Sequence, residues 1–271
     1  MLMEPMRPKK ALGQNFLVDE SVLDRIVACV APTPDDSILE VGPGRGALTR
    51  RLAVSGARFL AIEWDRDLLP ILEQEFAASP NVEIGHGDIL RVDLPKLLSD
   101  RSPGRKWKVA ANLPYNISSQ VLFRFLECSE LFERLVLMLQ KEVGDRLTAP
   151  PNCKDYGALT VLLRLHFDIR REFIVRPGAF RPVPKVDSAV LSFTPLAAPR
   201  AEVGDERFFS RVVKGAFNQR RKTLLNSLRS AGFDSADGSL QEAFSRAGID
   251  AGRRGETLSL EEFAALSLAL Q

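Results

Sequence analysis

The sequence contains few of the residues that most often bind metals or form disulfides. Its 271 residues include only three cysteines and two histidines. Cys29, Cys128 and Cys153 are odd in number and too widely spaced for a local metal-binding knuckle. His86 and His166 are too few for a histidine-based metal site without carboxylates beside them. The sequence therefore predicts reduced, structural cysteines and no bound metal.

Long apolar runs are also missing. No run approaches the roughly 20 residues that a membrane-spanning helix needs. The N-terminus, Met1–Lys10, has no apolar stretch of the kind found in signal peptides. The composition, 45% hydrophobic and 27% charged, is that of a soluble globular protein. We therefore expect a cytoplasmic protein that does not contact a membrane, with room for one large domain and a smaller one.

The net charge of +2 conceals an uneven distribution. Residues 1–160 carry 20 basic and 22 acidic side chains, whereas residues 161–271 carry 17 and 13. Between positions 207 and 229 there is no acidic residue, and the basic ones are Arg207, Arg211, Lys214, Arg220, Arg221, Lys222 and Arg229. Such a cluster of one sign favours a polyanionic partner.

The most informative stretch is Ser37–Thr49, where a short apolar run leads into glycines at positions 42, 44 and 46. The run has the length of a buried strand, and the residues from Ala47 onward have the pattern of a helix. Glycine tolerates positive φ and has no Cβ, so backbone N–H groups at the helix N-terminus can approach a ligand closely. Strand, glycine loop and helix together predict a binding site for a cofactor that contains adenosine.

The glycines alone do not identify the cofactor. Gly42, Gly44 and Ala47 also satisfy the dinucleotide fingerprint, whose third small residue can be alanine. A second buried strand, Phe59–Glu63, ends in a carboxylate about 20 residues after the first glycine. Under either interpretation we expect Glu63 to accept hydrogen bonds from the ribose hydroxyls.

Strands and helices alternate through the first two thirds of the chain, which predicts a doubly wound, mainly parallel sheet. Ligands of such sheets collect at the carboxyl ends of the strands. Gly42, Glu63, Asp88 and Asn112 each stand at the end of a predicted strand. Asp88 would suit the amine of an adenine ring.

The remaining pattern predicts a second domain. Residues 167–175 and 186–193 are expected to be late strands that close the sheet in an antiparallel manner. Residues 196–204 have the composition of a linker, and the pattern from Asp205 onward is only helical. We expect an N-terminal segment at 1–18, a cofactor-binding α/β domain at 19–196 and a small all-helical domain at 205–271.

The stretch Asn112-Leu113-Pro114-Tyr115 follows a strand beside the predicted cofactor site. A turn of this kind could support the methylation of an aromatic exocyclic amine. That reaction is difficult, because the amine lone pair is delocalised into the ring. The side-chain oxygen of Asn112 and the carbonyl of Leu113 could accept both amine hydrogens and favour a pyramidal nitrogen. Pro114 would stiffen the turn, and Tyr115 would offer an aromatic face to a base flipped out of its stack.

The chain resembles the ribosomal RNA adenine N(6),N(6)-dimethyltransferase family of the small ribosomal subunit. The resemblance covers almost the whole chain. It rests on five motifs in order: Lys10–Leu17, Glu40–Thr49, Asn112–Ser118, Phe180–Ser188 and Ala216–Leu224.

The resemblance implies a Rossmann-like class I methyltransferase sheet, mostly parallel with an antiparallel closing strand, and S-adenosylmethionine as the cofactor. It implies that Asn15 and Leu17 close over the cofactor and that Gly42 lies under its methionine part. Glu63 would hold the ribose, and Asp88 and Ile89 would meet the adenine.

The remaining implied roles concern the substrate. Asn112 would face both the methyl donor and the target, and Tyr115 and Phe180 would form two aromatic walls around the target base. The resemblance also implies that the N-terminal segment 1–18 contacts cofactor and RNA and that the helical domain 205–271 binds RNA. Within that domain the run Arg220, Arg221 and Lys222 would contact RNA.

In similar enzymes the reaction transfers four methyl groups to two adjacent adenosines in a hairpin near the 3′ end of 16S rRNA. The implied partner is a small-subunit precursor, and we expect a monomer. Three alternatives remain: a resistance-type enzyme acting on large-subunit rRNA, an assembly checkpoint that acts mainly by occupying the particle, and a nicotinamide oxidoreductase. Mitochondrial relatives that act in transcription are disfavoured by the compact length and the lack of a transit segment.

Overall fold

The computed structural model describes residues 13–233 and 239–271. Residues 1–12 of the predicted N-terminal segment, with the first part of the Lys10–Leu17 motif, lie outside the described residues. The chain forms two compact units. The first contains the residues up to Gly144 together with Ile169–Pro195, and the second contains Asp145–Asp168 and Leu196–Gln271.

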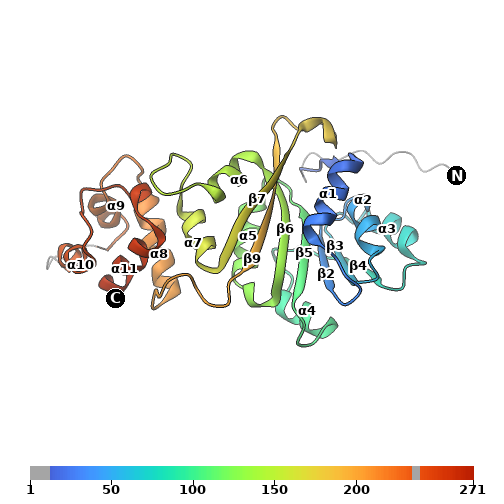
Figure 1. Ribbon diagram of the computed structural model, residues 1–271, viewed down its shortest axis with the longest axis horizontal. Coiled ribbons are helices and arrows are strands. Elements are labelled where there is room, and N and C mark those ends of the chain that lie inside the picture. The colour runs from blue at the N-terminus through green and yellow to red at the C-terminus, as the bar shows by residue number, and fades with distance from the viewer. Residues whose placement is uncertain (1–12, 234–238) are drawn as a thin grey trace. The chain divides into compact units, whose positions relative to one another are not determined.

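The first unit is built on a seven-stranded sheet in the order β4-β3-β2-β5-β6-β9-β7 (Figure 1). The strands are β2 (Ser37–Val41), β3 (Arg58–Glu63), β4 (Val82–His86), β5 (Trp107–Asn112), β6 (Phe132–Gln140), β7 (Phe167–Val175) and β9 (Ser188–Pro195). The pairs β4–β3, β3–β2, β2–β5 and β5–β6 are parallel, and β6–β9 is antiparallel. This order confirms the predicted doubly wound sheet with an antiparallel closing strand.

The central strands are apolar because both faces of the sheet are covered. All five residues of β2 are buried, as are the last five of β3. The helices and 3₁₀ turns between the strands are α1 (Glu20–Val30), α2 (Ala47–Ala53), α3 (Leu69–Phe76), α4 (Leu94–Arg101), α5 (Ser118–Leu126), η2 (Ser129–Leu131) and α6 (Lys141–Thr148). Asp19 caps α1, because its side chain accepts a hydrogen bond from the Val22 N–H.

A two-stranded ribbon joins distant parts of the first unit. β1 (Phe16–Leu17) pairs antiparallel with β8 (Phe180–Arg181), which follows the short turn η3 (Pro177–Ala179). The Val18 N–H also donates to the Ala179 carbonyl at 2.9 Å. This ribbon attaches the N-terminal segment to the end of the sheet where the parallel strands finish.

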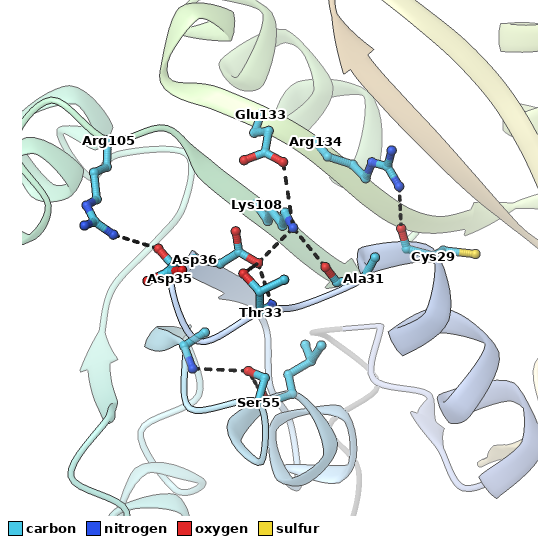
Figure 2. Close-up of polar contacts among 12 residues, drawn as sticks. Cys29, Ala31, Thr33, Asp35, Asp36, Ser55, Arg105, Lys108, Glu133 and Arg134 are labelled. Atoms are coloured by element: carbon cyan, nitrogen blue, oxygen red, sulfur yellow. Dashed lines mark hydrogen bonds and ion pairs between the residues drawn. The ribbon is translucent and has the colours of Figure 1, made fainter.

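The opposite end of the sheet is held by a buried lysine (Figure 2). Lys108 is 7% exposed, and its amine donates to the Ala31 carbonyl at 2.9 Å and to Asp36 at 2.8 Å. Burial alone would raise the pKa of Asp36, but the hydrogen bonds from Lys108 and Thr33 outweigh it and lower the pKa. The contact ties the end of α1 to the start of β2 and β5, on the side away from the strand ends predicted to bind ligand.

The second unit is helical. Its elements are α7 (Ala158–His166), α8 (Glu206–Phe217), α9 (Leu224–Ser230), α10 (Ser239–Ala247), η4 (Gly255–Thr257) and α11 (Leu260–Leu270). Asp205 caps α8, and Ser259 and Glu262 form a capping box at the start of α11. Phe217 packs against Tyr156 and Phe263, with ring centroids 5.9 and 5.7 Å apart.

The boundary between the units differs from the single linker expected at 196–204. Residues 145–168 group with the C-terminal helices, although the sequence prediction placed them in the α/β domain. The physical reason is the apolar surface of α7, whose Val161, Leu162 and Leu165 are buried, and the contacts that α7 makes with α8 and α11. No helix in the described part of the chain is long and apolar enough to cross a membrane.

Candidate active site

A cavity of about 570 Å³ lies at the carboxyl ends of the parallel strands. It sits where the strand order reverses between β2 and β5, the position at which doubly wound sheets bind ligands. Its volume is in the range of small-molecule sites. Among the residues that line it are Asn15, Leu17, Gly42, Gly44, Glu63, Asp88, Ile89, Asn112, Leu113, Pro114 and Tyr115. The structure thus brings together every residue predicted to contact the cofactor.

The three glycines of the loop after β2 all have positive φ, with values of 69°, 60° and 72° at Gly42, Gly44 and Gly46. A Cβ on Gly44 would lie 3.0 Å from the Phe16 ring, and one on Gly46 would lie 3.0 Å from the Phe76 ring. A Cβ on Gly42 would meet no atom within 4 Å. Since Gly42 lines the cavity, its missing side chain leaves open the space that a cofactor needs.

Glu63 is held firmly at the edge of this loop. Its two carboxylate oxygens accept hydrogen bonds from the Gly44 N–H at 3.0 Å and the Asp65 N–H at 2.8 Å. Burial raises the pKa of Glu63, and the backbone hydrogen bonds work against that shift. Each carboxylate oxygen has two lone pairs, so the fixed group retains acceptor capacity for a pair of hydroxyls.

Glu40 is a site residue that the sequence analysis missed. It is 2% exposed, lines the cavity, and accepts a hydrogen bond from the Thr49 hydroxyl at 2.6 Å. Burial raises the pKa of Glu40 to about 8, against the opposing effect of Thr49, and the nearby Glu63 adds to the rise. The sequence feature that could have identified Glu40 as a site residue is a carboxylate inside an otherwise apolar strand.

This carboxyl group makes stability depend on pH. The pKa of Glu40 rises from 4.5 to about 8 on folding, so between these values the folded state keeps a proton that the unfolded state releases. The contribution of protonated Glu40 to the free energy of unfolding is fully present below pH 4.5. It is lost as the pH rises toward 8, by at most about 1.4 kcal/mol per pH unit. We expect Glu40→Gln to remove this decline in the free energy of unfolding, measured with denaturant from pH 5 to 8. An identical slope in variant and parent would contradict the assignment.

The part of the cavity beside the ends of β3 and β4 combines Asp88 with aromatic surface. The Asp88 side chain accepts from the Leu90 N–H at 3.0 Å, and Ile89 is buried beside it. Trp64 lines the cavity and stacks on His86, with ring centroids 5.9 Å apart and ring planes 13° apart. Trp64 was not among the predicted residues, because a tryptophan directly after a strand does not by itself indicate a ligand.

The N-terminal strap, residues 13–18, lines the same cavity. The Gln14 side chain donates to the Asp65 carboxylate at 2.8 Å, next to Glu63. The Asn15 carbonyl accepts a hydrogen bond from the Asn112 side chain at 3.0 Å. The strap therefore bonds both to Asp65, after β3, and to Asn112, at the end of β5.

The turn from Asn112 to Tyr115 is fixed from several directions. Because the amide nitrogen of Asn112 donates to the strap, its Oδ1 is the acceptor that remains for a ligand. The Leu113 N–H donates to the Met138 carbonyl at 3.1 Å. The Tyr115 hydroxyl lies 2.8 Å from that of Ser188 on β9, and burial raises the pKa of this half-buried tyrosine. The turn presents a side-chain oxygen and an aromatic ring to one cavity.

Phe180 is not brought to the cavity. It is 1% exposed and packs in the core with residues that include Leu17, Leu23 and Val175. The β1–β8 ribbon causes this, because the Leu17–Phe180 pair turns the ring away from solvent. In this structure Tyr115 alone of the two predicted aromatic walls faces the site.

The predicted RNA-binding run has two kinds of residue. Arg220 donates to the carbonyls of Lys154 and Tyr156 at 2.5 and 3.1 Å, and its guanidinium lies 3.5 Å from Glu256. Arg221 and Lys222 are exposed. Arg220 thus holds a loop of its own unit in place, whereas Arg221 and Lys222 project from the surface.

Within residues 13–233 and 239–271, no group of three or more histidine, cysteine, aspartate or glutamate side chains lies together as metal ligands would.

Comparisons of the chain with a family model and with individual known proteins agree with one another. A model of the family described as ribosomal RNA adenine dimethylase matches residues 6–271. The ribosomal RNA small subunit methyltransferase A of Geobacter metallireducens is 62% identical over 98% of this chain and 97% of its own length. That of Geobacter sulfurreducens is 56% identical over 98% of this chain and 96% of its own.

Two crystal structures share the fold. A dimethyladenosine transferase from Plasmodium falciparum has a TM-score of 0.78 at 23% identity, covering 93% of this chain and 96% of its own. The 23S rRNA methyltransferase ErmE has a TM-score of 0.70 at 27% identity, covering 94% and 99%. The sheet is therefore that of the class I methyltransferases, and the chain belongs to the ribosomal RNA adenine dimethylase family.

Proposed function

We propose that this chain transfers methyl groups from S-adenosylmethionine to the N(6) amines of two adjacent adenosines in a hairpin near the 3′ end of 16S rRNA. The observation that carries the proposal is a single cavity lined both by the buried Glu63 carboxylate and by the Asn112–Tyr115 turn. The small-subunit target is supported by the names of the Geobacter relatives, which share more than half of their residues with this chain.

The residues around the cavity suit S-adenosylmethionine. Gly42 would lie under the methionine part, Glu63 would accept from both ribose hydroxyls, and Asp88 and Ile89 would meet the adenine. Asn15 and Leu17 of the strap would cover the cofactor. When bound, the cofactor supplies a methyl group on a positively charged sulfur, which an amine lone pair can attack.

The chain's own contribution is to orient the target amine. Asn112 Oδ1 and the Leu113 carbonyl would accept the two amine hydrogens, which favours a pyramidal nitrogen with its lone pair directed at the methyl group. The base would stack on Tyr115. No strong base is needed, because the methylated nitrogen is cationic and loses its proton readily. In the second transfer the amine has one hydrogen, so one of the two acceptors would go without a donor.

Arg221 and Lys222 are proposed to contact RNA phosphates, and Arg220 to support the loop that it bonds. Arg220→Ala is expected to lower the free energy of unfolding by about 1–2 kcal/mol through the lost hydrogen bonds. Lys222→Ala is expected to leave the free energy of unfolding unchanged and to weaken binding to small subunits. The slope of the logarithm of the binding constant against the logarithm of the salt concentration should become smaller by about one unit. Denaturant unfolding and binding at several salt concentrations measure both. The assignment fails if Lys222→Ala binds with the parent's salt slope.

We further propose that the enzyme is a cytoplasmic monomer and that its partner is a precursor of the small subunit. The cofactor assignment is tested by titrating the protein with S-adenosylmethionine and, separately, with NAD. The readout is tryptophan fluorescence, because Trp64 lines the cavity and the other tryptophan, Trp107, is 1% exposed. We expect a saturable change with S-adenosylmethionine only. A response to NAD alone would favour the oxidoreductase alternative.

A further inference from the structure

Two exposed apolar side chains stand close together in the segment after β8. Six large apolar residues are exposed in the described chain. Val183 and Val186, which follow β8, are 57% and 43% exposed, whereas Val18, which is 45% exposed, lies at the other end of the antiparallel β1–β8 ribbon. A concentration of this kind indicates a surface that meets a partner.

The segment after β8, residues 182–186, is referred to as the proline loop. It contains Pro182 and Pro184 on either side of Val183, and proline restricts the backbone. At its start the β1–β8 ribbon fixes it next to the strap that lines the cavity. At its end Asp187 pairs with Arg176 at 2.7 Å, and the Asp187 carbonyl accepts from the Lys141 N–H at 2.9 Å.

A further contact ties the loop to the chemistry. Ser188, two residues after the loop, bonds to the Tyr115 hydroxyl at 2.8 Å. The aromatic ring proposed to carry the target base and the foot of the proline loop are therefore held together. A group at the tip of this loop has a defined position relative to Tyr115.

The charges on the loop indicate which kind of partner it binds. Arg181 and Lys185 are exposed on either side of Val183. The Arg181 guanidinium donates to the carbonyls of Gly178 and Phe180 at 3.0 and 2.8 Å. Among the described residues neither cation has an acidic partner within ion-pair distance. An apolar tip between two cations fits RNA, which offers flat base faces between phosphates.

We propose that Val183 inserts into the RNA stack where the target adenosine leaves it, while Arg181 and Lys185 bind the flanking phosphates. This inference rests on the proposed function. The amine can reach Asn112 only if the base leaves its stack, which costs a few kcal/mol. In other nucleic-acid complexes, apolar side chains inserted between bases partially unstack them, and the protein's other contacts repay the cost. The most exposed valine of the loop, braced by two prolines, is suited to that position.

The test compares Val183→Ala with Val54→Ala, a matched control at an 86% exposed valine after α2. The probe is the hairpin RNA with 2-aminopurine in place of the target adenosine, whose fluorescence rises when the base unstacks. In the presence of S-adenosylhomocysteine we expect a rise with the parent and with Val54→Ala, and at least about a fivefold smaller rise with Val183→Ala. An equal rise with Val183→Ala, or none with the parent, overturns the inference.

Two further measurements separate this inference from the proposed function. The single-turnover methylation rate on unmethylated small subunits should fall about tenfold in Val183→Ala, with thermal stability and cofactor affinity unchanged. Lys185→Gln should reduce the salt slope of particle binding by about one unit. If the parent does not methylate the particle, the proposed function fails. If the parent methylates and Val183→Ala does so equally well, only the inserted valine is refuted.

Discussion

Replacing Asn112 with alanine is expected to lower the single-turnover rate of methyl transfer by about 10²–10³-fold, the loss seen when one preorganised hydrogen-bonding group is removed from an active site. The amide of Asn112 is fixed by its 3.0 Å bond to the Asn15 carbonyl, so its oxygen is already oriented before the amine arrives. Alanine removes both the acceptor and this link to the strap. The rate is measured with enzyme in excess over unmethylated small subunits.

The effect should be on turnover more than on particle binding, because the proposed ligand contacts of the amide are with the reacting amine and the methyl donor and not with the rest of the RNA. Asn226→Ala, at an exposed asparagine of α9, is the matched control and should react at the parent's rate. An Asn112→Ala enzyme with full activity would refute the assigned role of the Asn112–Tyr115 turn.

The second large effect is expected on cofactor affinity. In Glu63→Gln the side chain presents an N–H₂ group to one of the two backbone N–H donors, Gly44 or Asp65, that the carboxylate accepts from. Hydrogen bonds to charged groups contribute about 1.5–3 kcal/mol each, so we expect affinity for S-adenosylmethionine to fall about 100-fold. Titration monitored by Trp64 fluorescence measures the change.

Glu73→Gln serves as the control for the Glu63 substitution, because it makes the same chemical change at an exposed position of α3. It should bind the cofactor as the parent does. Parent-like affinity in Glu63→Gln would mean that this carboxylate does not hold the ribose.

Much of the fold follows from local patterns. Apolar runs of strand length predicted the central strands of the sheet, and the glycines at 42, 44 and 46 predicted the loop with positive φ. The convergence of Glu63, Asp88 and Asn112 on one cavity was predictable because carboxyl ends of parallel strands meet at one edge.

Other features depend on contacts between residues far apart in sequence. The β1–β8 ribbon pairs Leu17 with Phe180, and only this pairing reveals that the Phe180 ring is buried. The grouping of residues 145–168 with the C-terminal helices has the same origin.

The fold does not identify the RNA target. ErmE, named for 23S rRNA, covers 94% of this chain, so the two kinds of enzyme share the sheet and the helical unit. What favours the small subunit is sequence similarity to the Geobacter enzymes. A role as an assembly checkpoint would use the same exposed side chains, Arg221 and Lys222, to bind the particle. A catalytically silent variant that still blocked subunit maturation would support that role.

The central claim is tested most directly by incubating the protein with labelled S-adenosylmethionine and, in separate tubes, unmethylated small and large subunits, followed by mass analysis of the nucleosides. Our account predicts dimethyladenosine in the small subunit only, approaching four methyl groups per particle. Label in the large subunit instead would contradict the small-subunit assignment, and label in neither would contradict catalysis itself.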